Sequence, residues 1–192
     1  LGVHPGELSA DEQHDGVRIV RLPGTGNQRF GVCFRPDRLA REIRQVDVVH
    51  LHDLRFMTGF VCLAARLLGR PLVYHTHGSP WHTAFASGLK QRLMRSYYGP
   101  MLRLARANVV ASSEHDRELL IADVPSLSPR TVTLPNAVDL VPYLAAERRP
   151  VPGRLLVIGR VADRKGIDRL IEGLAALRNR PDAPGWSLLI AG

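Results

Sequence analysis

Short apolar segments alternate with amphipathic segments along most of the chain, and this alternation limits the fold more than any other feature. Some segments carry apolar residues at helical spacing, whereas others, such as "DVVHL", are apolar nearly throughout. The segments predicted as strands are 15–23, 46–53, 70–78, 108–113, 130–136, 154–159 and 186–192. The segments predicted as helices are 35–45, 55–69, 86–107, 113–122 and 166–179, with a loop over 24–31. This order is typical of an α/β protein whose parallel sheet is covered by helices on both faces.

A proline-rich stretch divides the chain into two α/β units. Residues 140–153 contain three prolines and separate the last strand of the first unit from the first strand of the second. We therefore predict a first Rossmann-like domain over 1–140, a linker over 141–153 and the start of a second domain over 154–192. The second unit is too short to bury a parallel sheet, so we expect it to be truncated.

The composition limits the possible partners. The 192 residues carry a net charge of +8, which predicts a polyanionic partner. Aromatic residues make up only 6% of the chain and no nucleic-acid-binding motif is present, so nucleic acid is not the expected polyanion. The two cysteines, Cys33 and Cys62, form no disulfide framework and no zinc-binding pattern. They favour a reducing compartment, and we expect a cytoplasmic protein.

Ligands of open parallel sheets bind beyond the carboxyl ends of the strands. This rule selects four places, which are His52-Asp53, His75-Thr76-His77-Gly78, Pro135-Asn136 and Gly159-Arg160. At the last of these, Arg160 and Lys165 precede a predicted helix, whose free amide groups favour an anion. The two cations could hold a diphosphate without a metal. The alternative is an ordinary basic loop exposed to solvent.

The histidines at the strand ends leave a second class of function open. The segments "HLHD" and "HTH" supply four histidines and Asp53, residue types that can bind zinc. A metal-dependent hydrolase would explain these histidines without any transfer of a sugar. A non-catalytic nucleotide-binding α/β protein is a further alternative. Against the hydrolase, no additional cluster of histidine or acidic residues follows at ligand spacing.

Five motifs, in order, resemble retaining glycosyltransferases of family 4, which have the GT-B fold of two Rossmann-like parallel-sheet domains. The similar segments, which together run from about Asp47 to Gly192, are "VDVVHLHD", "PLVYHTHG", "NVVASSEHDREL", "TLPNAVDL" and "LLVIGRVADRKGIDRLIEGLAAL". The resemblance implies sugar transfer from a nucleotide-activated donor to an acceptor, with retention of configuration and without a metal or other cofactor. It places the donor mainly on the second domain and the acceptor on the first.

The same resemblance assigns expected roles to individual residues. It implies that Gly159, Arg160 and Lys165 hold the donor diphosphate, and that the charges of the two cations assist catalysis. It places His77 in the cleft near the sugar, as a catalytic residue. His52, Asp53 and Gly78 are candidates for the acceptor side, with Asp53 equally suited to cap the following helix. His75 is expected at most to support His77.

The chain also departs from the family pattern at both ends. The family's glycine-rich loop near the amino terminus is missing, and its paired glutamates would lie beyond Gly192. We therefore expect a fragment that is inactive on its own.

Residues 88–107 carry several basic residues together with Tyr97 and Tyr98. This segment suits either a peripheral contact with the anionic inner face of a membrane, next to a lipid-linked acceptor, or a core-packed helix with a solvated basic face. Without the membrane contact, the acceptor would be a soluble sugar or another small molecule.

Overall fold

The structure of the chain is a computed structural model that describes residues 9–25, 32–33, 35–52, 54–78, 87–147, 149–178 and 185–192. The chain divides into two compact units, Leu1–Ala137 and Val138–Gly192. The boundary between the units falls after Ala137, close to the predicted end of the first domain at residue 140. Each unit is described by itself.

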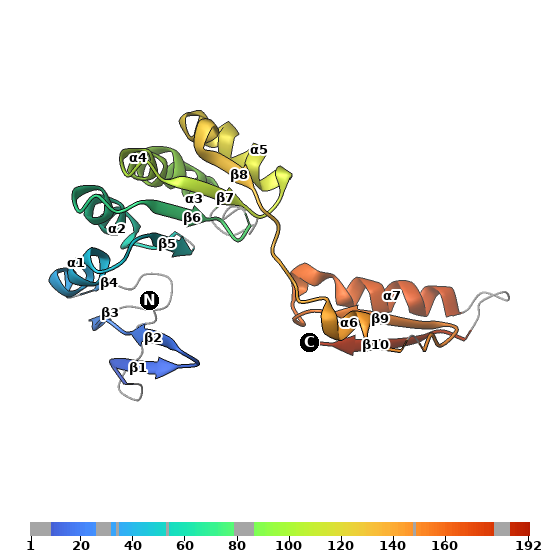
Figure 1. Ribbon diagram of the computed structural model, residues 1–192. Helices are drawn as coiled ribbons and strands as arrows, with labels where there is room; N and C mark the ends of the chain where they lie inside the picture. The colour runs from blue at the N-terminus through green and yellow to red at the C-terminus, as the bar shows by residue number, and fades with distance from the viewer. Residues whose placement is uncertain are drawn as a thin grey trace. The chain divides into compact units, whose positions relative to one another are not determined.

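A parallel sheet of four strands forms the centre of the first unit (Figure 1). Its strands are β5 (Val49–His52), β6 (Leu72–His75), β7 (Asn108–Ala111) and β8 (Thr131–Thr133), and they lie in the order β5-β6-β7-β8. Neighbouring strands in space are therefore neighbours in sequence, and their carboxyl ends lie at one edge of the sheet. This arrangement confirms the predicted α/β class.

Helices connect these strands and lie on one face of the sheet (Figure 1). They are α1 (Pro36–Arg44), α2 (Thr58–Leu67), α3 (Ser87–Leu93), a π-helix (Met94–Tyr98), α4 (Gly99–Leu104), α5 (Glu114–Asp123) and a 3₁₀-helix (Pro125–Arg130). The prediction that helices cover both faces is wrong for the described part of the chain. Right-handed crossovers that step in one direction across a sheet put every connecting helix on the same side. The other face of β5 to β8 carries none of these helices.

Local signals in the sequence explain where several helices begin and end. After α2, Gly69 takes a left-handed conformation with φ of +66°, as a glycine beyond a helix end commonly does. Ser113 caps α5, because its side chain accepts a hydrogen bond from the backbone N–H of Asp116 at 3.1 Å. The segment predicted as one helix over 86–107 is interrupted by a π-helical turn over Met94–Tyr98, after which Pro100 occupies the first turn of α4.

The core lies between the sheet and the helices. Leu72 and Tyr74 of β6 and Val109 of β7 are buried there, together with Leu102 of α4. Cys62 of α2 is fully buried in the same core, and burial raises the pKa of its thiol to about 11. Cys62 is therefore a packing residue, because its thiol stays protonated at neutral pH.

Two short antiparallel pairs precede the parallel sheet, and the sequence did not predict them. The first is a hairpin of β1 (Asp11–His14) and β2 (Val17–Val20). Asp15 and Gly16 form its turn with φ of +47° and +78°, the conformation that an Asp-Gly type I′ turn requires. The second pair is β3 (Gly24–Thr25) and β4 (Val32–Cys33), so the predicted loop over 24–31 begins with a strand.

The second unit contains the predicted strand, helix and strand. After α6 (Val141–Leu144), which lies in the predicted linker, come β9 (Arg154–Ile158), a 3₁₀ turn (Asp163–Lys165), α7 (Ile167–Arg178) and β10 (Ser187–Ala191). Strands β9 and β10 pair in parallel (Figure 1). No helix among the described residues of the chain has the length and apolar character of a membrane span.

Candidate functional site

Histidines from two neighbouring strands project from the sheet face opposite the described helices. His50 and His52 are two residues apart on β5, so their side chains lie on the same face. His75 lies directly opposite His52 on β6 and shares that face. His77 follows β6 by two residues. The core-forming Tyr74 points to the opposite, helix-covered face, because successive side chains alternate along a strand.

The four rings are in mutual contact. The Nδ1 atom of His52 lies 2.6 Å from the Nε2 atom of His77, a hydrogen-bond distance. The ring of His77 also stacks on that of His75, with 4.1 Å between the centroids. The centroids of His50 and His52 are 4.0 Å apart. These four residues, defined here as the histidine cluster, place the predicted site residues His52 and His77 together at the carboxyl edge of the sheet.

The backbone at His77 has an unusual conformation. His77 has φ of +48° and Gly78 has φ of +103°, both in the left-handed region. A non-glycine residue adopts such angles at a cost, and this strain concentrates at functional sites. Just before this turn, the Thr76 N–H donates to the Val110 carbonyl at 3.0 Å and ties the chain to β7. The turn that presents His77 therefore starts from a fixed point on the sheet.

The surroundings of His52 and His75 favour the neutral form of these two rings. Partial burial lowers the pKa of both His52 and His75, and neighbouring histidines lower it further. His75 also has a polar neighbour on the next strand connection, because its Nε2 atom lies 3.4 Å from the Ser112 hydroxyl. His52 and His75 are therefore less readily protonated than a free histidine side chain.

The second unit holds the predicted phosphate-binding residues on one loop. Gly159 begins this loop with φ of +145°, and its N–H donates to the Ala191 carbonyl at 2.8 Å. Arg160 and Lys165 are both exposed. The Lys165 side chain reaches back over the start of the loop, because its Cε atom would lie 3.9 Å from a Cβ atom placed on Gly159.

Helix α7 starts directly after this loop, as predicted. Gly166 takes a left-handed conformation with φ of +63° after the 3₁₀ turn, and α7 begins at Ile167. The first-turn N–H groups of α7 and the two cations therefore lie close together in the chain, an arrangement suited to an anion. The glycine at position 159 also leaves room for close approach of a ligand to the backbone.

Three residues at or near the predicted site need separate description. Asp53, predicted for the acceptor side, lies outside the described residues. Gly78 is described and adopts the left-handed turn after β6, which the sequence did not predict. His50, which the sequence pointed to only as one of four histidines that could bind zinc, belongs to the cluster. It shares a sheet face with His52 because the two residues alternate along β5.

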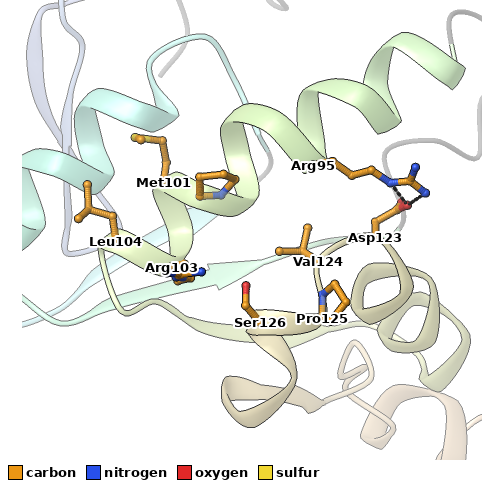
Figure 2. Close-up of a pocket in the computed structure, with 9 residues that line it drawn as sticks. Arg95, Met101, Arg103, Leu104, Asp123, Val124, Pro125 and Ser126 are labelled. Atoms are coloured by element: carbon orange, nitrogen blue, oxygen red, sulfur yellow. Dashed lines mark hydrogen bonds and ion pairs between the residues drawn. The ribbon is translucent and has the colours of Figure 1, made fainter.

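A pocket of about 590 Å³ lies elsewhere in the first unit, between α4 and the segment that follows α5 (Figure 2). Arg95 points toward Asp123 across it, with 2.6 Å between Nη2 of Arg95 and Oδ1 of Asp123. The Asp123 side chain is only 3% exposed, and the Gln91 amide also donates to it at 3.0 Å. The sequence did not predict this ion pair between an exposed arginine and a buried aspartate, because the two residues are distant in the sequence.

The sequence of the first unit matches a known protein family. The family described as "Glycosyl transferase 4-like domain" matches residues 2–137, which covers most of the first unit and more than half of the chain. The chain belongs to this glycosyltransferase family. The predicted family resemblance is thereby confirmed, as is the Rossmann-like character of the first domain.

Characterised relatives match nearly the whole chain. The GDP-mannose:cellobiosyl-diphosphopolyprenol alpha-mannosyltransferase of Xanthomonas oryzae pv. oryzae (strain PXO99A) is 37% identical over 97% of the chain and 47% of its own length. The enzyme of the same name from Komagataeibacter xylinus is 26% identical over 98% of the chain and 46% of its own length. Glycogen synthase of Mycobacterium tuberculosis (strain CDC 1551 / Oshkosh) is 30% identical over 98% of the chain and 49% of its own length. The chain thus spans about half the length of the curated relatives it matches.

Proposed function

We propose that the protein containing this chain is a glycosyltransferase that moves a sugar from a nucleotide-activated donor to a lipid-linked acceptor, with retention of configuration and without a metal. The observation that carries the proposal is the 37% identity, over 97% of the chain, to an enzyme named for GDP-mannose and a diphosphopolyprenol acceptor. GDP-mannose is accordingly the first donor to test. The similarity to glycogen synthase keeps other nucleotide sugars in the comparison.

The loop of the second unit is suited to the donor diphosphate. Arg160 can present a planar fork to phosphate oxygens, and Lys165 adds a second positive charge beside Gly159. As the bond between the sugar and the diphosphate breaks, negative charge grows on the leaving nucleoside diphosphate. Fixed positive groups lower the energy of that state more than the energy of the bound donor. This arrangement removes the need for a metal to neutralise the leaving group.

His77 is suited to contact the sugar or the acceptor. Its exposed ring follows the carboxyl end of β6, where ligands of parallel sheets bind, and its backbone is held in a left-handed turn. The hydrogen bond to His52 fixes the orientation of the ring and leaves the other ring nitrogen of His77 available. We assign His77 to the reaction, and His52, Asp53 and Gly78 to the acceptor side. A metal-dependent hydrolase would use the same histidines, but the sugar-transferring relatives support transfer instead.

Exposed apolar residues on the helices after β6 support the lipid-linked acceptor. Leu89, Leu93 and Tyr97 recur every four residues and are 60%, 39% and 38% exposed. Exposed Arg92 and Arg103 accompany them. A basic helical segment with exposed apolar side chains binds anionic bilayer surfaces. We propose that this segment rests on the membrane that carries the acceptor.

The decisive experiment uses the longest natural chain that contains these residues. Radiolabelled GDP-mannose and cellobiosyl-diphosphopolyprenol are supplied with a chelator, and glycolipid products are separated and counted. The proposal predicts a labelled glycolipid with the anomeric configuration of the donor, at a rate that the chelator does not reduce. UDP-glucose and ADP-glucose serve as competing donors. The proposal fails if no nucleotide sugar yields a labelled product, or if transfer stops when the chelator is added.

A further inference from the structure

We propose that His50, His52, His75 and His77 form a binding site for a divalent transition metal ion, distinct from the diphosphate-binding loop, and that a bound metal inhibits sugar transfer. The inhibitory consequence rests on the proposed function, because it assigns His77 to the transfer reaction. Metal binding itself does not depend on that assignment. It follows from the arrangement of the rings.

The ring nitrogens are close enough to share one ion. Ligand atoms of His50, His52 and His75 all lie within 4.8 Å of one another. Zinc binds imidazole nitrogens at about 2.1 Å, so two ligands of a tetrahedral site lie about 3.4 Å apart. Small side-chain rotations would gather the three nitrogens without movement of the strands. His77 can supply a fourth ligand to the same ion. Its Nε2 atom already lies 2.6 Å from Nδ1 of His52, so both nitrogens can reach one ion.

The strands supply the rigidity that such a site needs. His50 and His52 project from β5, and His75 lies opposite His52 in the hydrogen-bonded register of β6. Sites on paired strands hold their ligands more closely than sites on loops. The Ser112 hydroxyl lies 3.4 Å from Nε2 of His75 and can orient that ring while the other nitrogen binds the ion. His50, His52 and His77 are exposed, so an ion can enter from solvent.

The chemistry of the ligands selects the class of metal. Imidazole suits Zn²⁺, Ni²⁺ and Cu²⁺, whereas Mg²⁺ and Ca²⁺ prefer oxygen ligands. The four imidazoles are neutral ligands, so an ion bound there keeps its positive charge. We therefore expect selectivity for late transition metals over magnesium.

A bound metal would change the role of His77. Coordination replaces the hydrogen bond between His52 and His77 and occupies a lone pair of each ring that binds the ion. A metal on Nε2 leaves the proton of the neutral His77 ring on Nδ1, so that second nitrogen could donate a hydrogen bond but no longer accept a proton or a hydrogen bond. Zinc should therefore reduce transfer even though transfer needs no metal, and a chelator should restore the rate.

The test measures metal binding directly on the longest natural chain, without substrate. Isothermal titration with ZnCl₂, NiCl₂ and MgCl₂ gives stoichiometry and affinity, and the visible absorption of bound Co²⁺ reports tetrahedral coordination. We expect one Zn²⁺ per chain and no detectable Mg²⁺ binding. His50→Ala and His50→Gln should each weaken Zn²⁺ binding at least about tenfold, since each removes one ligand. His14→Ala is the matched control, because His14 lies on the exposed β1 strand away from the cluster.

The outcomes separate the two proposals. The site is supported if one Zn²⁺ binds per chain and His50→Ala weakens this binding whereas His14→Ala does not. This result supports the site whether or not sugar is transferred. Absence of stoichiometric Zn²⁺ binding in a folded protein, or equal affinities for the two variants, overturns it. Circular dichroism verifies folding of each variant.

In the transfer assay, His50→Ala should keep its activity and lose inhibition by zinc. Transfer that zinc does not inhibit overturns the inhibitory role and leaves the proposed function in place.

Discussion

The Nε2 atom of His77 lies 2.6 Å from the Nδ1 atom of His52, across the carboxyl ends of two adjacent parallel strands. One of these nitrogens must carry the proton and the other must accept it, so the two rings fix each other's tautomer. His77 is also the residue with φ of +48°, so the same position combines backbone strain with an oriented imidazole. The two properties can be separated by substitution.

Replacement of His77 by glycine and by alanine should give different stabilities but similar losses of activity. Alanine must adopt the left-handed conformation at a cost of about 1 kcal/mol, whereas glycine adopts it freely. Both changes remove the imidazole and with it a hydrogen bond worth about 1 kcal/mol, so turnover should fall about fivefold or more. Urea unfolding and initial rates of transfer measure the two effects. Wild-type turnover in His77→Gly would show that the ring plays no part in the reaction.

Membrane contact can be tested by replacing exposed apolar residues of α3 with aspartate. Leu89→Asp and Leu93→Asp should each reduce binding to vesicles rich in anionic lipid, because each removes apolar contact and adds a repelled charge. Leu67→Asp on α2 is the matched control, since Leu67 is also exposed but lies on a different helix. Co-sedimentation measures the bound fraction at low and high salt. Equal binding by all three variants would place the membrane contact elsewhere or exclude it.

The ion pair between Arg95 and Asp123 should respond unequally to loss of either partner. The Asp123 side chain is 3% exposed and that of Arg95 is 57% exposed. Arg95→Met leaves the buried Asp123 carboxylate with fewer donors, and an under-satisfied buried acceptor of this kind costs about 2 kcal/mol. Asp123→Asn leaves Arg95 free to reach solvent and should cost about 1 kcal/mol. Chemical denaturation of both variants gives the difference, and a larger loss for Asp123→Asn would contradict this account.

The regular elements could be predicted from the sequence because their signals are local. The helices predicted over 55–69 and 113–122 correspond to α2 and α5, whose ends lie at a glycine, Gly69, and at a capping serine, Ser113. The Asp15-Gly16 turn was an equally local signal for the β1–β2 hairpin, but the preceding residues of β1 are mostly polar and lack an apolar pattern. Hairpins held largely by ion pairs, such as Arg18 with Asp11, carry little hydrophobic signal.

Features that depend on strand order could not be predicted in the same way. Which face of the sheet the helices cover depends on whether successive strands step in one direction, and periodicity does not determine that order. The contacts of His50 depend on it too, since they require β5 to pair with β6 in one specific register. The left-handed backbone of His77 gives no sequence signal, because this conformation is uncommon in any residue other than glycine.

The loop after β9 allows the most direct test of donor binding. If Arg160 and Lys165 hold the diphosphate, their charges help most as the leaving group becomes more negative. Arg160→Ala and Lys165→Ala in the longest natural chain should each raise the barrier by about 2 to 4 kcal/mol, as the loss of an oxyanion-type donor does. Affinity for the nucleoside diphosphate should fall as well, because charge-assisted hydrogen bonds to phosphate also operate in the bound donor.

Two neighbouring arginines serve as controls for this test. Arg169→Ala removes an exposed cation from α7 and should change little. Arg164→Ala is also predicted to have a small effect, although the Arg164 side chain lies outside the described residues. Turnover and GDP affinity are measured for the four variants with and without chelator, which should alter neither quantity. Equal, small effects at positions 160, 164, 165 and 169 would mean that this is an ordinary basic loop, because a diphosphate site requires the cations that face it to matter more than their neighbours.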